Sequence, residues 1–89
     1  MKKIVIDGKK LNDEAAVHEY LADRLNFPGY YGKNLDALAD CLSEINYPLK
    51  IKIKNSGLLL ESLGDTYRVL ITVFEDSAAD NKNLTIKIK

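Results

Sequence analysis

The 89-residue sequence has no tryptophan, one cysteine and one histidine. Cys41 alone cannot form an internal disulfide, and small domains without disulfides are typical of reducing compartments. His18 has no second histidine or spaced cysteine with which to hold a metal, so we expect no metal and no cofactor, and we interpret His18 as a surface residue. These shortages exclude disulfide-rich and metal-stapled small folds.

Long apolar runs are also missing. The first one, Ile4–Ile6 after two lysines, is too short for the core of a signal peptide, and no stretch reaches the roughly 18 residues of a membrane-spanning helix. We therefore expect a cytoplasmic protein with no membrane partner. The composition, 46% hydrophobic and 29% charged, is typical of a globular protein, and the length predicts a single domain over residues 1–89.

Three short segments have the alternation and β-branched residues of strands. Residues 49–54 and 84–89 alternate strictly, so one face of the sheet is apolar and the other is mostly lysine. Residues 2–6 end in a compact apolar run, which predicts a strand that is covered more fully than the other two. The lysines of the polar face are Lys50, Lys52, Lys54, Lys87 and Lys89.

Four helices are expected between these strands. The first begins after Asn12 as its N-cap and ends near Asn26, and the second begins after Asn34 as its cap and ends before Tyr47. The third covers residues 57–63 and the fourth residues 65–79. Each pair of helices is long enough to connect parallel strands. The predicted fold class is therefore α/β, with two layers: a three-stranded parallel sheet and helices packed on one face.

Net charge is also absent, because thirteen lysines and arginines match thirteen aspartates and glutamates. A strongly basic balance is expected of proteins that bind nucleic acid or membrane surfaces, so we expect no direct nucleic-acid contact. The distribution is uneven, however. Residues 12–46 hold seven acidic and two basic side chains and residues 61–81 hold five and one, whereas the other segments are basic. Neutrality is therefore a cancellation between an acidic helical side and a basic sheet side.

One stretch, Pro28–Asp40, joins two tyrosines between glycines to a helix with an acidic outer face. Asp36 and Asp40 lie four residues apart, one turn from each other, and no basic residue occupies position 32 or 44 to offset them. Like charges at this spacing cost a few tenths of a kcal/mol, roughly. The pattern fits a solvated acidic face, a hydrolase carboxylate pair or an acidic surface that docks onto another protein.

The sequence PGYYGKNLDALADCL, residues 28–42, resembles the hallmark of the barstar family of intracellular ribonuclease inhibitors. The similarity continues through Asp7-Gly8, Tyr47-Pro48, Val73-Phe74 and Thr85-Ile86, and so covers essentially the whole chain. It implies a barstar-like fold and no enzyme activity. It also implies stoichiometric inhibition of a small secreted ribonuclease of the barnase type, in a 1:1 complex formed by a free monomer, as in an immunity protein or antitoxin.

The resemblance also implies which residues bind the partner. Asp40 matches the principal anchor of the family, Asp36 matches a second acidic contact, and Asp76 stands where the family has glutamate. Ala39 stands where the family has tryptophan, and residues 43–46 lack the glycine and tryptophan found there. The predicted partner-binding residues are Tyr30, Asn34, Leu35, Asp36, Ala39, Asp40, Ser43 and Asp76.

A different function remains open on the other side of the sheet. The lysine face could make the protein a module that binds RNA or another anion. Such a module needs aromatic side chains for stacking on the same face, and the three predicted strands contain none. By the same resemblance, Tyr47-Pro48 matches a cis peptide bond of the barstar family, and the sequence does not decide whether the bond is cis here.

Overall fold

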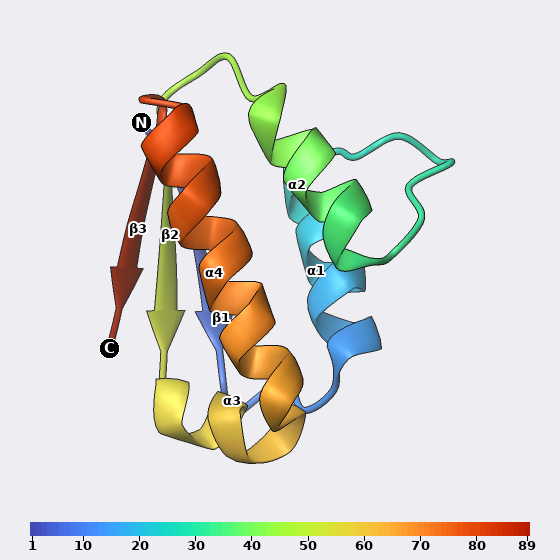
Figure 1. The fold of residues 1–89 in the computed structure, drawn as a ribbon, viewed down its shortest axis with the longest axis vertical. Coiled ribbons are helices and arrows are strands. Elements are labelled where there is room, and N and C mark those ends of the chain that lie inside the picture. The colour runs from blue at the N-terminus through green and yellow to red at the C-terminus, as the bar shows by residue number, and fades with distance from the viewer.

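The computed structural model describes all 89 residues and contains three strands and four helices (Figure 1). The number, type and order of the elements agree with the sequence prediction. In chain order they are β1 (Lys2–Asp7), α1 (Glu14–Leu25), α2 (Leu35–Ser43), β2 (Leu49–Lys54), α3 (Ser56–Leu63), α4 (Asp65–Asp80) and β3 (Leu84–Ile88).

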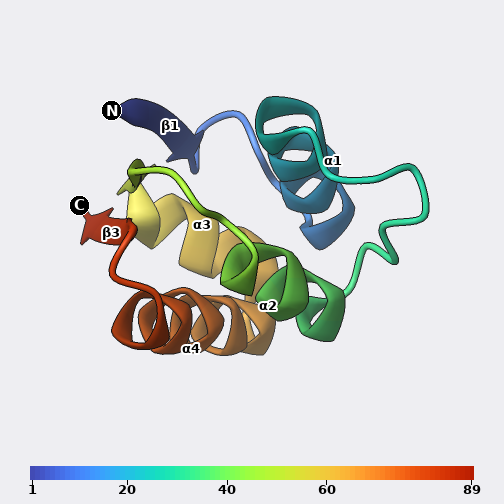
Figure 2. The same ribbon diagram turned by 90° about the horizontal axis from the view of Figure 1, so that it is seen from above.

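The strands form one parallel sheet in the order β1-β2-β3. Figure 2 shows the helices gathered on one side of this sheet. The structure therefore confirms the predicted two-layer α/β fold with a three-stranded parallel sheet. The register places Lys3 beside Lys50, and Lys52 between Val5 and Lys87, on the face away from the helices.

The expectation that the first strand is the most covered was wrong. β1 is an edge strand, and only Ile4 and Ile6 in it are buried. The central strand β2 buries Leu49, Ile51 and Ile53 completely. The apolar run of β1 was misleading because a strand's cover depends on its place in the sheet, which its own sequence does not encode.

The core lies between the sheet and the helices. Sixteen buried apolar residues form one cluster, and Phe74 of α4 is its largest fully buried side chain. Burying such a side chain contributes about 1.5–3 kcal/mol. Leu38 and Leu42 anchor the inner side of α2 in this cluster, so its outer side is presented to solvent in a defined orientation.

The helix ends explain how the chain enters and leaves α1 and α2. Asp13, one residue later than predicted, caps α1 by accepting a hydrogen bond from the Ala16 N–H at 2.7 Å. Asn26 ends that helix in the left-handed conformation. Asn34 caps α2 as predicted, accepting from the Ala37 N–H at 2.8 Å. The structure has no cis peptide bond, so the Tyr47–Pro48 bond is trans, unlike the family bond that it matches.

Candidate docking site

The loop between α1 and α2, residues 26–34, points Tyr30 outward and Tyr31 inward, and we call it the tyrosine loop. Tyr31 is buried, and its ring packs against Phe27 with centroids 4.9 Å apart. Tyr30 is 89% exposed. The Tyr31 N–H donates to the Pro28 carbonyl at 2.9 Å, which closes a tight turn around residue 30. The loop therefore holds Tyr30 in solvent next to an anchored residue.

The anchor of this loop is His18. This histidine is only 1% exposed, so the prediction of a surface residue was wrong. Its Nδ1 lies 2.6 Å from the Tyr31 hydroxyl, and its Nε2 lies 3.1 Å from a carboxylate oxygen of Glu14. Burial, with smaller contributions from Cys41 and Glu14, raises the pKa of Tyr31 to about 12. His18 thus ties the loop to α1.

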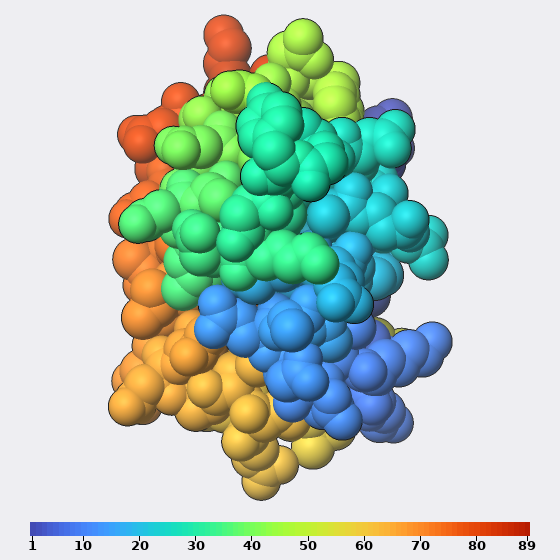
Figure 3. Space-filling model, turned by 90° about the vertical axis from the view of Figure 1, so that its right-hand side faces the viewer, coloured from blue at the N-terminus to red at the C-terminus, as the bar shows by residue number.

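The outer side of α2 carries carboxylates that are free of partners. Asp36 and Asp40 are exposed, and neither takes part in a salt bridge, since the only ion pairs in the structure are His18–Glu14 and Lys33–Glu19. The Asn34 side chain also donates to the Gly32 carbonyl at 3.3 Å, which joins the loop to the start of the helix. Figure 3 shows α1, the loop and α2 as one continuous face of the molecule.

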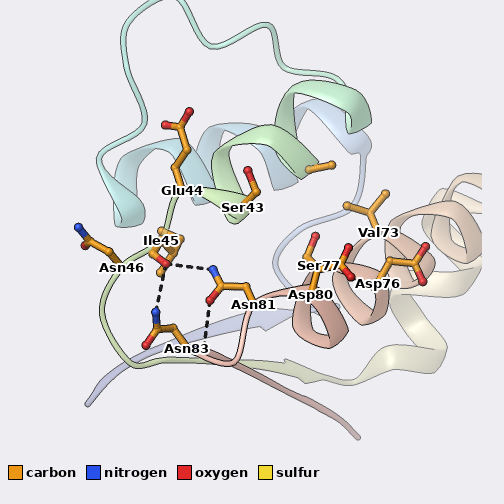
Figure 4. A pocket seen from close by; sticks show the side chains of 11 residues that line it. Ser43, Glu44, Ile45, Asn46, Val73, Asp76, Ser77, Asp80, Asn81 and Asn83 are labelled. Carbon is orange, nitrogen blue, oxygen red and sulfur yellow. Dashed lines mark hydrogen bonds between the residues drawn. The ribbon is translucent and has the colours of Figure 1, made fainter.

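Three grooves border the second half of α2, and two of them are lined by residues predicted to bind the partner. The larger of these two, about 450 Å³, lies between α2 and α4, and the smaller, about 300 Å³, lies between α2 and the tyrosine loop. Glu44 lines both of them. Among the predicted residues, Ala39, Ser43 and Asp76 line the larger groove (Figure 4), and Tyr30 and Asp40 line the smaller one.

The other three predicted residues lie outside the grooves. Asp36 is exposed one turn before Asp40, Leu35 is half-buried against the core, and the Asn34 side chain is used in capping. The prediction missed two further groove carboxylates, Glu44 and Asp80. Asp80 follows Asp76 by four residues, so the same helical spacing that singled out the pair on α2 could have found it.

The wall of the larger groove is held by amide side chains from the turn after α4. The Asn81 side chain donates to the Leu42 carbonyl at 3.1 Å. It also donates to the Ile45 carbonyl at 3.0 Å and accepts from the Asn83 N–H at 3.0 Å, as Figure 4 shows. Together with the Ile45 N–H, which donates to the Leu42 carbonyl at 3.3 Å, and the Asn83 side chain, which donates to the Ile45 carbonyl at 3.4 Å, these bonds satisfy carbonyls at and just after the end of α2. The groove beside Ala39 is therefore built on a well-connected backbone.

The structure gives little support to a hydrolase. Burial, followed by the charges of Glu44 and Asp40, raises the pKa of the Cys41 thiol, which disfavours a nucleophilic thiolate. Asp36 and Asp40 project from one exposed helix face, and Asp36 lines neither groove.

The structure contains no cluster of three potential metal ligands, and none of its helices has the length and apolarity needed to cross a bilayer.

The structure thus combines a small α/β scaffold with an exposed acidic helix face on α2 and a loop that His18 holds against α1. The family model described as "Barstar (barnase inhibitor)" matches residues 1–89, so the chain belongs to the barstar family. The chain is also similar to the "Putative ribonuclease inhibitor YrdF" of Bacillus subtilis (strain 168), with 37% identity over 91 residues covering 98% of this chain and 100% of the relative. Both findings support ribonuclease inhibition as its role.

Proposed function

We propose that this protein is a 1:1 inhibitor of a small secreted microbial ribonuclease of the barnase type, and that α2 and the loop before it block the enzyme's active site. The observation that carries the proposal is the set of unpaired carboxylates on and beside α2. Asp36, Asp40 and Glu44 lie on this helix or at its end, and Asp76 and Asp80 face it from α4.

The chemistry follows from what a ribonuclease must bind. Its active site carries cationic groups that hold RNA phosphates, and carboxylates entering that site form charge-assisted hydrogen bonds to the same groups. Asp40 is central because it borders the smaller groove next to the exposed Tyr30. The phenol ring adds apolar contact area at low entropic cost. The inhibitor therefore substitutes its own carboxylates for the phosphates of the substrate.

The shape of the larger groove limits the choice of enzyme. Ala39, in place of the tryptophan expected from the family resemblance, contributes only a methyl group to a groove of about 450 Å³. A ribonuclease that presents a protruding side chain fits this hollow better than one adapted to a bulky inhibitor side chain. We therefore propose that the natural target differs from barnase in the surface that faces Ala39.

We propose further that the protein is not an enzyme, is monomeric when free and acts in the cytoplasm as an immunity protein or antitoxin. The environments of His18 and Cys41 support the proposal that the protein is not an enzyme. His18 is buried and engaged by two hydrogen bonds, and the pKa of Cys41 is raised.

The test is a titration of purified protein against a panel of small secreted microbial ribonucleases, with RNA cleavage and calorimetric heat measured in parallel. For at least one enzyme, activity should fall linearly and reach zero at one molar equivalent. If tenfold excess of the protein leaves every enzyme of the panel fully active, the proposed function is wrong.

A further inference from the structure

The face of the sheet opposite the helices is uncovered and carries six lysines. We call it the lysine face, and it consists of Lys3, Lys50, Lys52, Lys54, Lys87 and Lys89. None of these lysines forms a salt bridge. All-parallel sheets are almost always covered on both faces, so a bare face of this kind is unusual. The inhibitor function, which uses the helical side, leaves it unexplained.

The lysines of this face repel one another. The register places Lys3 directly beside Lys50, and Lys52 beside Lys87, on strands that are about 4.8 Å apart. Like charges in directly opposite positions destabilise a sheet. The charge of Lys89 is the largest of several causes, partial burial and other lysines of the face among them, that lower the pKa of Lys52. A polyanion lying on the face would relieve this repulsion.

A groove of about 340 Å³ continues the lysine face past the edge of β1. Its wall combines the outer face of β1 with α1 and the turn between them. The Arg24 guanidinium lies over the Tyr20 ring, 5.3 Å from its centroid, and the Val5 N–H donates to the Tyr20 hydroxyl at 3.3 Å. The residues that line the groove are Val5, Asp7, Lys10, Leu11, Tyr20, Arg24 and Lys54.

This groove supplies the stacking side chains that the strands lack. Tyr20 comes from α1, so inspection of the strands alone could not find it, and Lys54 belongs to both the groove and the lysine face. Nucleobases stack on arginine planes and on aromatic rings. Proteins that bind single-stranded nucleic acids combine a positively charged groove with aromatic side chains on which bases stack. The β1 groove and the row of lysines provide the same combination.

One carboxylate lies among these cations and is held in place. The Asp7 carboxylate accepts hydrogen bonds from the Asn55 side chain at 2.8 Å and from the Lys9 N–H at 2.9 Å. The bond from Asn55 is the main cause of the lowered pKa of Asp7. The groove therefore contains three cations and one anion, and its net charge remains positive.

We propose that the lysine face and the β1 groove together bind single-stranded nucleic acid, with phosphates on the lysines and one base against Arg24 and Tyr20. This activity is separate from ribonuclease inhibition and does not rest on it. A lysine face alone would also attract the acidic helical side of a second copy of this chain. The groove favours nucleic acid, because a carboxylate-bearing protein surface has no base to stack.

The two faces of the molecule can act at the same time. Figures 1 and 2 show the sheet on one side of the molecule and the tyrosine loop on the other. The molecule measures 32 × 27 × 19 Å, whereas the Debye length at physiological ionic strength is about 8 Å. Screening therefore separates the acidic docking face from the lysine face, and zero net charge does not prevent polyanion binding.

The experiment measures fluorescence anisotropy of a labelled 20-nucleotide oligouridylate, and of its thymidine DNA counterpart, at 50 to 200 mM salt. Weak binding, with a dissociation constant of about 10⁻⁴ to 10⁻⁶ M that rises with salt, is expected for at least one sugar type, and the tighter probe identifies which. Replacing Lys50, Lys52 and Lys87 by glutamine should weaken binding at least tenfold at 50 mM salt. It should also lower the salt slope by about 2, since each phosphate contact on a single strand contributes roughly 0.7.

A matched control separates the face from general charge. The variant Lys33→Gln, Arg68→Gln, Lys82→Gln removes the same net charge from other parts of the surface and should change the affinity less than twofold. Replacing the three face lysines by arginine should retain binding, and an unchanged circular dichroism spectrum and Tm of the glutamine variant exclude a folding defect as the cause of its loss. Equal losses in the two glutamine variants would overturn the proposal, as would the absence of binding to both probes at 50 mM salt.

A second comparison tests the groove. Arg24→Gln should weaken oligonucleotide binding at least fivefold, because base stacking contributes about 1–3 kcal/mol, and should weaken inorganic polyphosphate binding less than twofold. Arg68→Gln serves as the matched control for the lost charge. If Arg24→Gln weakens both probes equally, no base occupies the groove. If the protein sediments as an oligomer at low salt and binds neither probe, the lysine face contacts a second copy of the chain. That result would refute the proposal.

Discussion

The hydrogen bond between Tyr31 and His18 offers the sharpest test of how the tyrosine loop is held against α1. Tyr31→Phe removes one oxygen atom and keeps the ring that packs on Phe27. It leaves Nδ1 of a fully buried histidine without its partner at 2.6 Å. Leaving a buried polar group unpaired costs about 1–3 kcal/mol, so the free energy of unfolding should fall by that amount.

The assay is urea unfolding followed by far-ultraviolet circular dichroism at pH 7. For a domain of 60–100 residues, each kcal/mol also lowers Tm by about 4–8 °C. Tyr30→Phe, which removes an exposed hydroxyl from the neighbouring ring, is the matched control and should change stability by less than about 0.5 kcal/mol. Amide exchange across residues 27–34 should accelerate in Tyr31→Phe more than exchange in β2.

The double variant His18→Leu, Tyr31→Phe completes the measurement. Replacing both partners by apolar groups removes the unpaired nitrogen, so the double variant should lose less stability than the sum of the two single variants. If Tyr31→Phe is as stable as wild type, or if the two losses add, the buried hydrogen bond does not hold the loop.

The raised pKa of Tyr31 adds a pH dependence with a definite sign. The folded state holds the phenol proton up to about pH 12, whereas an unfolded tyrosine releases it near pH 10. The stability advantage of wild type over Tyr31→Phe should therefore be constant below pH 10 and shrink as the pH rises from 10 to 12. An unchanged difference over this range in alkaline urea titrations would contradict the assigned burial of the phenol.

Two further predictions concern the scaffold. A Cβ at Gly8 would collide with backbone atoms at the start of α3, whereas a Cβ at Gly57 would meet nothing within 4 Å. Gly8→Ala should therefore destabilise the protein by about 1–3 kcal/mol or more, and Gly57→Ala should be neutral or stabilise it by up to about 1 kcal/mol, in thermal melts of both variants. Asn81→Ala should cost about 1–3 kcal/mol in urea unfolding, because the Leu42 and Ile45 carbonyls lose their shorter hydrogen bonds and keep the longer ones from the Ile45 N–H at 3.3 Å and the Asn83 side chain at 3.4 Å. A cost below about 0.3 kcal/mol would show that water replaces the amide.

Much of this fold was predictable because its signals are local. Alternation along β2 and β3, the Asn34 cap and the apolar stripe of α2 each depend on residues within a few positions of one another. The pair Asp36 and Asp40 was visible for the same reason, since helical spacing alone places both on one face.

The features that sequence reasoning missed depend on contacts between distant segments. Polar neighbours on α1 suggested that His18 faces water, but Tyr31 arrives from the next loop and covers it. In the same way, Tyr20 becomes part of a groove on the sheet side only because α1 packs along the edge of β1. The hydrophobic periodicity of one helix or strand does not encode its contacts with another element.

The most direct test of the docking site is the dissociation constant of Asp40→Asn for a ribonuclease that the wild-type protein inhibits. Asparagine keeps the shape of the side chain and removes the charge. Glu61→Gln removes an exposed carboxylate from α3, a helix that lies away from the tyrosine loop in Figure 1. Breaking a buried ion pair costs about 3–5 kcal/mol, so Asp40→Asn should bind at least a hundredfold more weakly with an unchanged Tm, and Glu61→Gln should bind like wild type. Equal affinities of Asp40→Asn and wild type would show that α2 does not enter the active site through Asp40.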